Sequence, residues 1–238
     1  TWGPTADTFA NDTDVWSTPA VGRLTDTNCD GHVDELDPPN IVFVSNDVAG
    51  TCCQCNGSTP INCTTGVLRV LDGATGHELW SLDHVTGSIG FSGTSVALGD
   101  VNGDHAMDIV AMTGEGKVVV LDGTGTLLMT SDLPASGIDP SIFGWGGGLA
   151  IADMDGDGAP EIAYGGTLYT TAGGTLKQLW SKPPGSLSEV LSTFVDLDGA
   201  ADGRLELLVG TAAYKLDGTA LWDRTDLAFG FPAVGDFD

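Results

Sequence analysis

Acidic loops at a repeated spacing are the part of this sequence best suited to chemistry. Four segments carry Asp, Asn or Glu at their first, third, fifth and ninth places, and the fourth segment has two extra residues before its third acid. Oxygen ligands at these places, with the carbonyl of the seventh residue turned inward, are the arrangement by which a short loop wraps Ca²⁺. Oxygen donors without imidazole or thiolate favour calcium over zinc or copper, and Mg²⁺ is disfavoured because it prefers a water-rich octahedron.

The candidate metal ligands follow from that spacing. They are Asp26, Asn28, Asp30, His32, Asp34 and Asp37 in the first loop, Asp100, Asn102, Asp104, Ala106 and Asp108 in the second, Asp153, Asp155, Asp157, Ala159 and Glu161 in the third, Asp196, Asp198, Asp202, Arg204 and Glu206 in the fourth, and Asp236 and Asp238 in an incomplete fifth. A solvated acidic turn would account for any one of these loops, but not for the same spacing in four of them. The sequence therefore predicts calcium as the cofactor.

The charge of the whole chain agrees with a need for cations. There are 33 Asp and Glu residues against 8 Lys and Arg, giving a formal net charge of −25. Nucleic acid and anionic membranes are excluded as partners, because both require clustered Lys and Arg. No apolar run approaches the ~18 residues of a membrane-spanning helix, so no membrane insertion is expected.

Five cysteines suggest disulfides in an added surface segment. They are Cys29, Cys52, Cys53, Cys55 and Cys63, and four of them crowd into residues 51–65, which contain no histidine. A zinc site is the alternative, but disulfides are favoured, with Cys29 expected near enough to join them and one thiol left free or paired outside the chain. Disulfides indicate an oxidising compartment, so the protein is expected outside the cell or at its surface. Glycosylation sequons at Asn11, Asn56 and Asn62 are compatible with that location.

The acidic loops belong to a longer internal repeat. Residues 94–110 align with 148–163, and the same frame recurs at 19–44 and 191–208 and begins again at 231–238. In each unit a strand of small residues enters the loop and a β-branched strand leaves it. Leu-Asp-Gly turns end the third strands at 71–73, 121–123 and 216–218, and Leu-Trp pairs lie in the fourth strands at 79–80, 179–180 and 221–222.

Short strands, tight turns and a repeat of roughly 40 to 50 residues predict an all-β propeller of four-stranded blades. A β-sandwich also has evenly spaced strands, but it does not need one motif in every fourth strand. EF-hands use similar loops between helices, and the residues flanking these loops predict strands instead.

A single propeller domain, or a portion of one, is expected over residues 1–238. The expected blades are about 16–83 with a Cys-rich insertion at 46–65, about 91–133, about 143–182 and about 188–224, followed by a partial blade at 229–238. About four complete blades would leave strand edges and a blade face exposed, which folded proteins avoid. Further blades are therefore expected from the same polypeptide beyond both ends or from another chain.

Phe-Gly pairs stand upstream of the loops at 143–144 and 229–230, and in degraded form at 91–93. With them, nearly the whole chain resembles the FG-GAP (VCBS-type) repeats of integrin α-subunit propellers and some bacterial and fungal lectins. The resemblance implies calcium loops that are structural, bridging the strands at each blade's edge. It also implies an adhesion or ligand-binding module that holds a protein or carbohydrate on the propeller face. The stretched fourth loop and the insertion at 46–65 depart from the family pattern, and the insertion is the candidate ligand-binding loop because it breaks the repeat.

No catalytic residue is expected. The four histidines are scattered, and no Gly-x-Ser-x-Gly elbow is present. The alternative class is a propeller enzyme. Residues 71–80 are similar to the blade signature of quinoprotein dehydrogenases, and adjacent Cys52 and Cys53 resemble their vicinal disulfide, but only one blade carries the signature fully. A calcium-dependent polysaccharide lyase on a related propeller is the other enzyme alternative.

Overall fold

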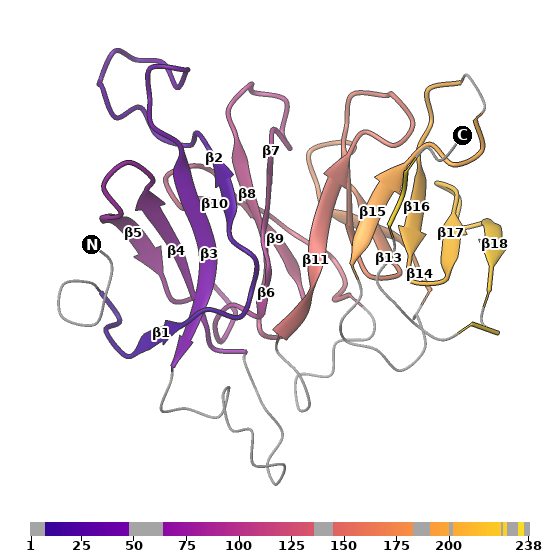
Figure 1. The fold of residues 1–238 in the computed structure, drawn as a ribbon, viewed down its shortest axis with the longest axis horizontal. Coiled ribbons are helices and arrows are strands. Elements are labelled where there is room, and N and C mark those ends of the chain that lie inside the picture. Colours follow the sequence, from indigo (N-terminus) through magenta and orange to yellow (C-terminus); the bar gives the residue numbers. More distant parts are fainter. Residues whose placement is uncertain are drawn as a thin grey trace, which may run out of the picture.

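The computed structural model describes residues 8–47, 64–135, 145–182, 191–199, 202–224, 226–227 and 233–235. These residues form 18 strands in four sheets and no helix (Figure 1). Within these ranges, therefore, no helix is long and apolar enough to cross a membrane. The predicted all-β fold is confirmed.

The four sheets follow one another along the chain. Sheet 1 contains β1 (Asp12–Asp14), β2 (Ala20–Gly22), β3 (Asn40–Asp47), β4 (Val67–Asp72) and β5 (Glu78–Leu82). Sheet 2 contains β7 (Ala97–Gly99), β8 (Asp108–Met112), β9 (Val118–Leu121) and β10 (Leu127–Thr130). Sheet 3 contains β6 (Gly93–Ser95), β11 (Trp145–Ala152), β12 (Glu161–Tyr164), β13 (Thr167–Thr170) and β14 (Lys177–Ser181). Sheet 4 contains β15 (Ser192–Val195), β16 (Glu206–Val209), β17 (Ala212–Tyr214) and β18 (Ala220–Asp223).

Each sheet contains an antiparallel meander of four consecutive strands, which begin with β2, β7, β11 and β15 respectively. These first strands touch in chain order, β2 with β7, β7 with β11, and β11 with β15. In addition, β6 pairs in parallel with β11, and Gly148 of β11 forms a parallel bridge to Leu191 just before β15. The four sheets thus stand side by side with their first strands adjacent (Figure 1). Within the described residues no strand pairing joins sheet 4 to sheet 1.

Three hydrophobic cores lie between neighbouring sheets. The central strands of sheet 2 bury every residue, because each carries apolar side chains on both faces. Ile109 and Leu121 pack toward sheet 1, whereas Val110 and Val120 pack toward sheet 3. The fourth strand, β10, alternates between half-buried and exposed residues, as expected for a strand at the sheet's rim. A third core joins sheets 3 and 4.

The predicted Leu-Trp pairs have a role in docking the sheets. The indole Nε1 of Trp80 in β5 donates to the carbonyl of Gly123 in sheet 2, at 3.1 Å. Trp180 in β14 donates in the same way to the carbonyl of Leu216 in sheet 4, at 2.7 Å. Each tryptophan therefore ties the fourth strand of one sheet to a turn of the next. Met129 occupies the corresponding place in β10, opposite Val120, and offers no donor.

In sheets 1, 2 and 4 the turn between the third and fourth strands contains the Leu-Asp-Gly repeat, but the triplet is not in the same structural position in each of them. In sheet 2 the turn is closed by the N–H of Asp122 donating to the carbonyl of Thr126. In sheet 4 the same bond runs from Lys215 to Thr219. Lys215 thus occupies the place of Asp122, and the Leu-Asp-Gly triplet of sheet 4 is offset by two residues.

A buried arginine fastens the N-terminal segment to sheet 1. Arg69 in β4 is 1% exposed and lies on the face of sheet 1 that points away from sheet 2. Its guanidinium donates to Glu78 and to side chains of Ser45 and Ser81. It also donates to the carbonyls of Thr8, Phe9 and Asp12. Residues 8–12 therefore cover this face, and a buried charge with this many acceptors is well compensated.

Candidate metal centres

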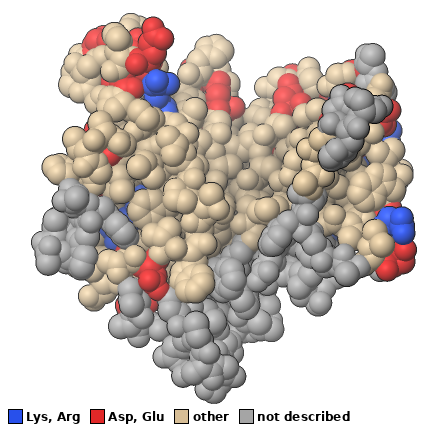
Figure 2. All heavy atoms as spheres, in the orientation of Figure 1, with Lys and Arg blue, Asp and Glu red and all other residues tan. Residues whose placement is uncertain are grey.

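The four acidic loops lie at one edge of the molecule. Each joins the first strand of a meander to the second, so all four emerge at the same end of their sheets (Figure 1). We call them loop 1 (residues 26–37), loop 2 (100–108), loop 3 (153–161) and loop 4 (196–206). Asp and Glu side chains gather along this edge (Figure 2).

Loops 2 and 3 share one hydrogen-bond pattern. The first aspartate, Asp100 or Asp153, accepts the N–H groups of the fourth and sixth residues. The third residue accepts the N–H of the fifth, and the fifth accepts that of the seventh. Local hydrogen bonding of this kind by Asp and Asn favours turns over regular strands. The side-chain oxygens are thereby held close to the loop's own backbone, and in loop 3 carboxylate oxygens also lie near one another.

In each loop one carboxylate is buried and accepts the backbone N–H of the loop's second residue. Val101 donates its N–H to Asp108, Met154 donates to Glu161, and Leu197 donates to Glu206, each at 2.9 Å. Asp108, Glu161 and Glu206 are at most 3% exposed. These acids begin the second strand of each meander, so the sheet fixes their position.

In loop 1 the buried carboxylate belongs to Asp37. Its Oδ1 accepts the N–H of Thr27 at 2.7 Å, which is the contact that Asp108 makes in loop 2. Asp37 is 2% exposed, whereas Asp34, which the nine-residue spacing would place there, is exposed. Burial raises the pKa of Asp37, but hydrogen bonds from Asp34, Thr27 and Asn28 outweigh it and hold the pKa below its ordinary value.

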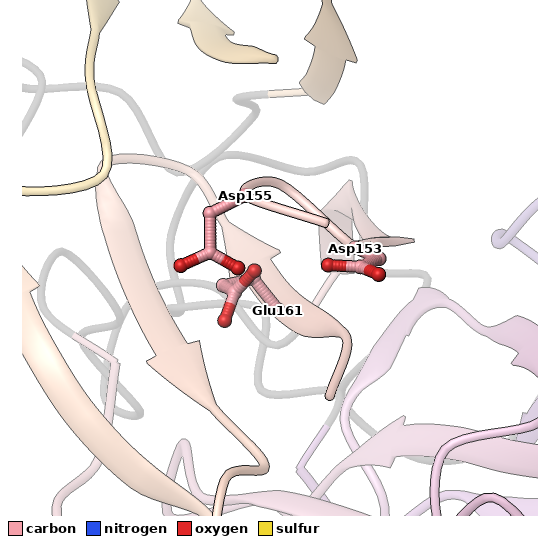
Figure 3. A group of neighbouring side chains, drawn as sticks. All are labelled: Asp153, Asp155 and Glu161. Atoms are coloured by element: carbon pink, nitrogen blue, oxygen red, sulfur yellow. The ribbon is translucent and has the colours of Figure 1, made fainter. Parts of the chain in front are cut away.

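Loop 3 brings three acidic side chains together. Carboxylate oxygens of Asp153, Asp155 and Glu161 lie within 4.8 Å of one another (Figure 3). Burial raises the pKa of Glu161, and the charges of Asp155 and Asp157 raise it further, although bonds from Met154 and Thr170 oppose the shift. Burial and the same kind of crowding, from Asp104 and Asp100, raise the pKa of Asp108 in loop 2. A bound cation would relieve this repulsion.

The donors present fit a hard cation such as Ca²⁺. All are carboxylate, amide or carbonyl oxygens, and loops 1 to 3 have no lysine or arginine side chain within 4 Å of their carboxylates among the described residues. His105 does approach Asp100, at 3.7 Å, but its side chain is 95% exposed. Among the described residues, only loops 3 and 4 bring three acidic side chains within 4.8 Å. Loop 2 replaces its second acid by Asn102, and loop 1 by Asn28.

Loop 4 differs from the others in a way that its spacing did not indicate. Asp196, Asp198 and Glu206 form its acidic cluster. The ammonium of Lys215, from the turn between β17 and β18, lies 3.1 Å from Asp198 Oδ2. Hydrogen bonding and charge attraction from Asp198 raise the pKa of Lys215, with further contributions from Glu206 and Asp202. Lys215 was the one feature of the sequence that could have indicated this difference, because lysine and arginine are scarce in the chain, with eight in all.

A cleft of about 430 Å³ lies between loops 3 and 4, and Lys215 is one of its lining residues. Asp155 faces it from loop 3, while Asp198 and Arg204 face it from loop 4. A second cleft, also of about 430 Å³, lies between loops 1 and 2 and contains Arg23. Arg23 donates its Nε to the carbonyl of Asp37 and so supports loop 1.

Several predicted site residues lie outside the described residues. They are Cys52, Cys53, Cys55, Cys63, the sequon residues Asn56 and Asn62, and Asp236 and Asp238. Asn11 is described and exposed.

Cys29 is exposed, and no described residue forms a disulfide with it. Loop 1 adjoins the Asn40 end of β3, whereas the chain enters the cysteine-rich segment after Asp47 at the other end. Eight strand residues span roughly 25 Å. The predicted closeness of Cys29 to the other cysteines stays a prediction, because those cysteines lie outside the described residues.

No protein-family model and no curated protein matches the chain. Among solved structures, it is similar to the V. cholerae biofilm matrix protein Bap1, with 25% identity and a TM-score of 0.68 over 93% of this chain and 32% of Bap1. It is also similar to the exotype rhamnogalacturonan lyase YesX, with 17% identity and a TM-score of 0.51 over 87% of this chain and 41% of YesX. The chain thus spans about a third of the length of Bap1, and the likeness to YesX concerns the fold alone.

Proposed function

We propose that this chain is a calcium-loaded portion of an extracellular FG-GAP-type β-propeller, in which the four sheets are blades. We further propose that it serves as a binding or adhesion module in a surface or matrix assembly, with no catalytic role. The observation that carries the proposal is the set of four acidic loops at one edge. Each has a buried carboxylate bonded to the N–H of the loop's second residue.

Asp153, Asp155 and Glu161 would hold the ion in loop 3, with Asp157 beside them. When bound, Ca²⁺ supplies positive charge that offsets the repulsion among these carboxylates. The residues themselves tie the end of β11 to the start of β12, so binding would stiffen the edge from which the loops project. The role of the metal is therefore structural.

The similarity to Bap1 supports a matrix or surface role, because a biofilm matrix protein carries a comparable arrangement over most of this chain. The ligand we propose is a protein or a carbohydrate bound on a face of the propeller. The clefts between neighbouring loops are candidate places for it, and each contains at least one arginine.

Further blades would pack against sheet 4. Trp222 in β18 lies opposite Ala213, as Trp180 lies opposite Leu168 in β14. Trp180 donates to a turn of the next sheet, whereas Trp222 is 38% exposed. We propose that Trp222 donates in the same way to a turn of a fifth blade, supplied by the same polypeptide or by another chain.

The deciding experiment is a thermal melt of the 238-residue chain with calcium and with a chelator. Binding to the native state alone stabilises it by about 2.7 kcal/mol per site at a hundredfold excess over Kd. We expect a large fall in Tm on chelation and recovery with calcium but not with an equal concentration of magnesium. A melting curve that is indifferent to chelator would contradict the proposal.

The ligand is sought on a glycan array probed with and without calcium. Binding that requires calcium supports the module proposal. Chain cleavage of an acidic polysaccharide such as rhamnogalacturonan, measured by the absorbance of the unsaturated product, would instead support the lyase alternative and overturn the non-catalytic role.

A further inference from the structure

Loop 4 carries its own cation. We propose that the Lys215 ammonium neutralises loop 4 in place of calcium, so that loops 1 to 3 take the metal and loop 4 does not. This inference rests on the proposed calcium-binding function and deepens it by assigning the metal to particular loops.

The contact is direct and comes from a different part of the sheet. Lys215 Nζ lies 3.1 Å from Asp198 Oδ2, and Asp198 belongs to the three-carboxylate cluster of loop 4. A calcium ion ligated by Asp198 would have to share that carboxylate with the ammonium. Two cations so close repel each other strongly where the surroundings are partly shielded from water.

The lysine is specific to sheet 4. Hydrogen bonds that close the turn between the third and fourth strands place Asp122 at the corresponding position in sheet 2 and Thr171 in sheet 3. In sheet 1 the longer turn starts at Asp72. These three turns, all within the described residues, contain no lysine or arginine that could reach loops 1 to 3 as Lys215 reaches loop 4.

Loop 4 also differs in its own residues. Arg204 corresponds to Ala106 of loop 2 and Ala159 of loop 3. Each of the three donates its backbone N–H to the acid two residues before it. Loop 4 has four acids, Asp196, Asp198, Asp202 and Glu206, as loop 3 does, but it alone combines them with two cationic side chains. Its charge is thus −2 instead of −4. Less negative charge lowers the affinity of an oxygen cage for Ca²⁺.

Calcium counting by equilibrium dialysis, with the metal measured by mass spectrometry, tests the assignment through differences between variants of the full chain. Asp155→Ala in loop 3 is expected to lose one bound calcium, whereas Asp198→Ala in loop 4 is expected to lose none. Lys215→Gln is expected to gain one, and adding Asp198→Ala to it is expected to abolish that gain.

Lys177→Gln is the matched control, because Lys177 is an exposed lysine on β14 that has no contact with an acidic loop among the described residues. It is expected to leave the count unchanged. Lys215→Arg keeps the cation and is likewise expected to gain nothing, which separates loss of charge from loss of the side chain.

Loss of one calcium in Asp198→Ala, or no gain in Lys215→Gln, would overturn the inference while leaving the calcium-binding function intact. If Asp155→Ala also lost none and the chain bound no calcium, the proposed function itself would fail. The Asp198→Ala result decides the matter even if Lys215→Gln were to misfold, because it needs only the native lysine.

Discussion

Glu161 in loop 3 combines three features that Glu206 shares in loop 4. It is 3% exposed, it accepts the N–H of Met154, and it lies beside two other acids of loop 3. Without a cation, ionisation of such a group costs more than ionisation of a solvated carboxylate, because burial and neighbouring charge both raise its pKa. The same carboxylate that costs stability in the metal-free protein should therefore increase it in the loaded protein.

Glu161→Gln should therefore affect stability differently in the metal-free and the calcium-loaded protein. The amide oxygen can still accept the N–H of Met154, so the metal-free Tm is expected to stay the same or rise. In calcium the variant should lose the increment from loop 3, about 2.7 kcal/mol at a hundredfold excess over Kd.

Glu115→Gln is the control, since Glu115 is exposed and accepts a backbone N–H from Ile89 in the same manner. Thermal melts of both variants with and without chelator make the comparison. Equal loss of Tm by Glu161→Gln in both states would contradict a metal-binding role for this residue.

The turn aspartates respond to pH through hydrogen bonds. Burial raises the pKa of Asp122, but the hydroxyl and N–H groups of Thr124 and Thr126 outweigh it and hold the pKa below its usual 3.8. Asp122 therefore contributes stability that is present above pH 3.8 and is lost as pH falls through the folded-state pKa.

The free-energy difference between the wild type and Asp122→Asn should be constant between about pH 5 and about pH 7 and shrink below pH 3.8. Urea unfolding of both proteins across that range measures it. A difference that grows on acidification would show that the depressed pKa has been assigned to the wrong group.

Between elements, the Trp-to-carbonyl bonds join one sheet to the next. Trp80 also packs its ring 3.3 Å from the place a side chain would take at Gly125, whose φ of +87° suits glycine. Trp180 packs against Gly218 in the same way. At both contacts the turn has a glycine with positive φ, and the tryptophan donates its indole N–H to the same turn. The turn glycine and the tryptophan of the repeat therefore act together.

Trp80→Phe and Trp180→Phe should each lower stability by about 1–3 kcal/mol, because each leaves a turn carbonyl without its donor. Trp222→Phe is the matched control and should change stability by less than about 0.5 kcal/mol in this chain, since its side chain is exposed. Chemical denaturation in saturating calcium provides the numbers. Equal effects at all three positions would mean that neither the hydrogen bond nor the packing against the next sheet's turn sets the cost.

The molecule as a whole carries a net charge of −25, with acids gathered on the loop edge (Figure 2). Self-repulsion of this size destabilises a compact state, and salt screens it over a Debye length of about 10 Å at about 0.1 M. Sodium chloride should therefore raise the Tm of the chelated protein and raise it less in the calcium-loaded protein.

Choline chloride at equal ionic strength serves as the control for sodium binding. Matching increases with both salts would attribute the effect to screening. A Tm that is lowered by both would show that repulsion is not what limits the metal-free fold.

The sequence by itself determined the strands and the acidic loops, because both depend on local features. Short runs of apolar, mostly β-branched residues specify strands such as β8 and β9, and Asp, Asn and Gly specify loops that bond to their own backbone. The repeat made the four sheets visible for the same reason, since each meander is encoded within a single unit.

The tertiary structure decided which of these residues meet. Asp37 replaces Asp34 as the buried acid of loop 1 because β3 begins beside it and the loop's N–H groups converge on its carboxylate. Lys215 reaches Asp198, seventeen positions away along the chain, because the β15–β16 and β17–β18 connections emerge at the same edge of sheet 4. Arg69 likewise gathers acceptors from residues about sixty positions away. Such meetings depend on register and on how sheets stack, which local composition does not encode.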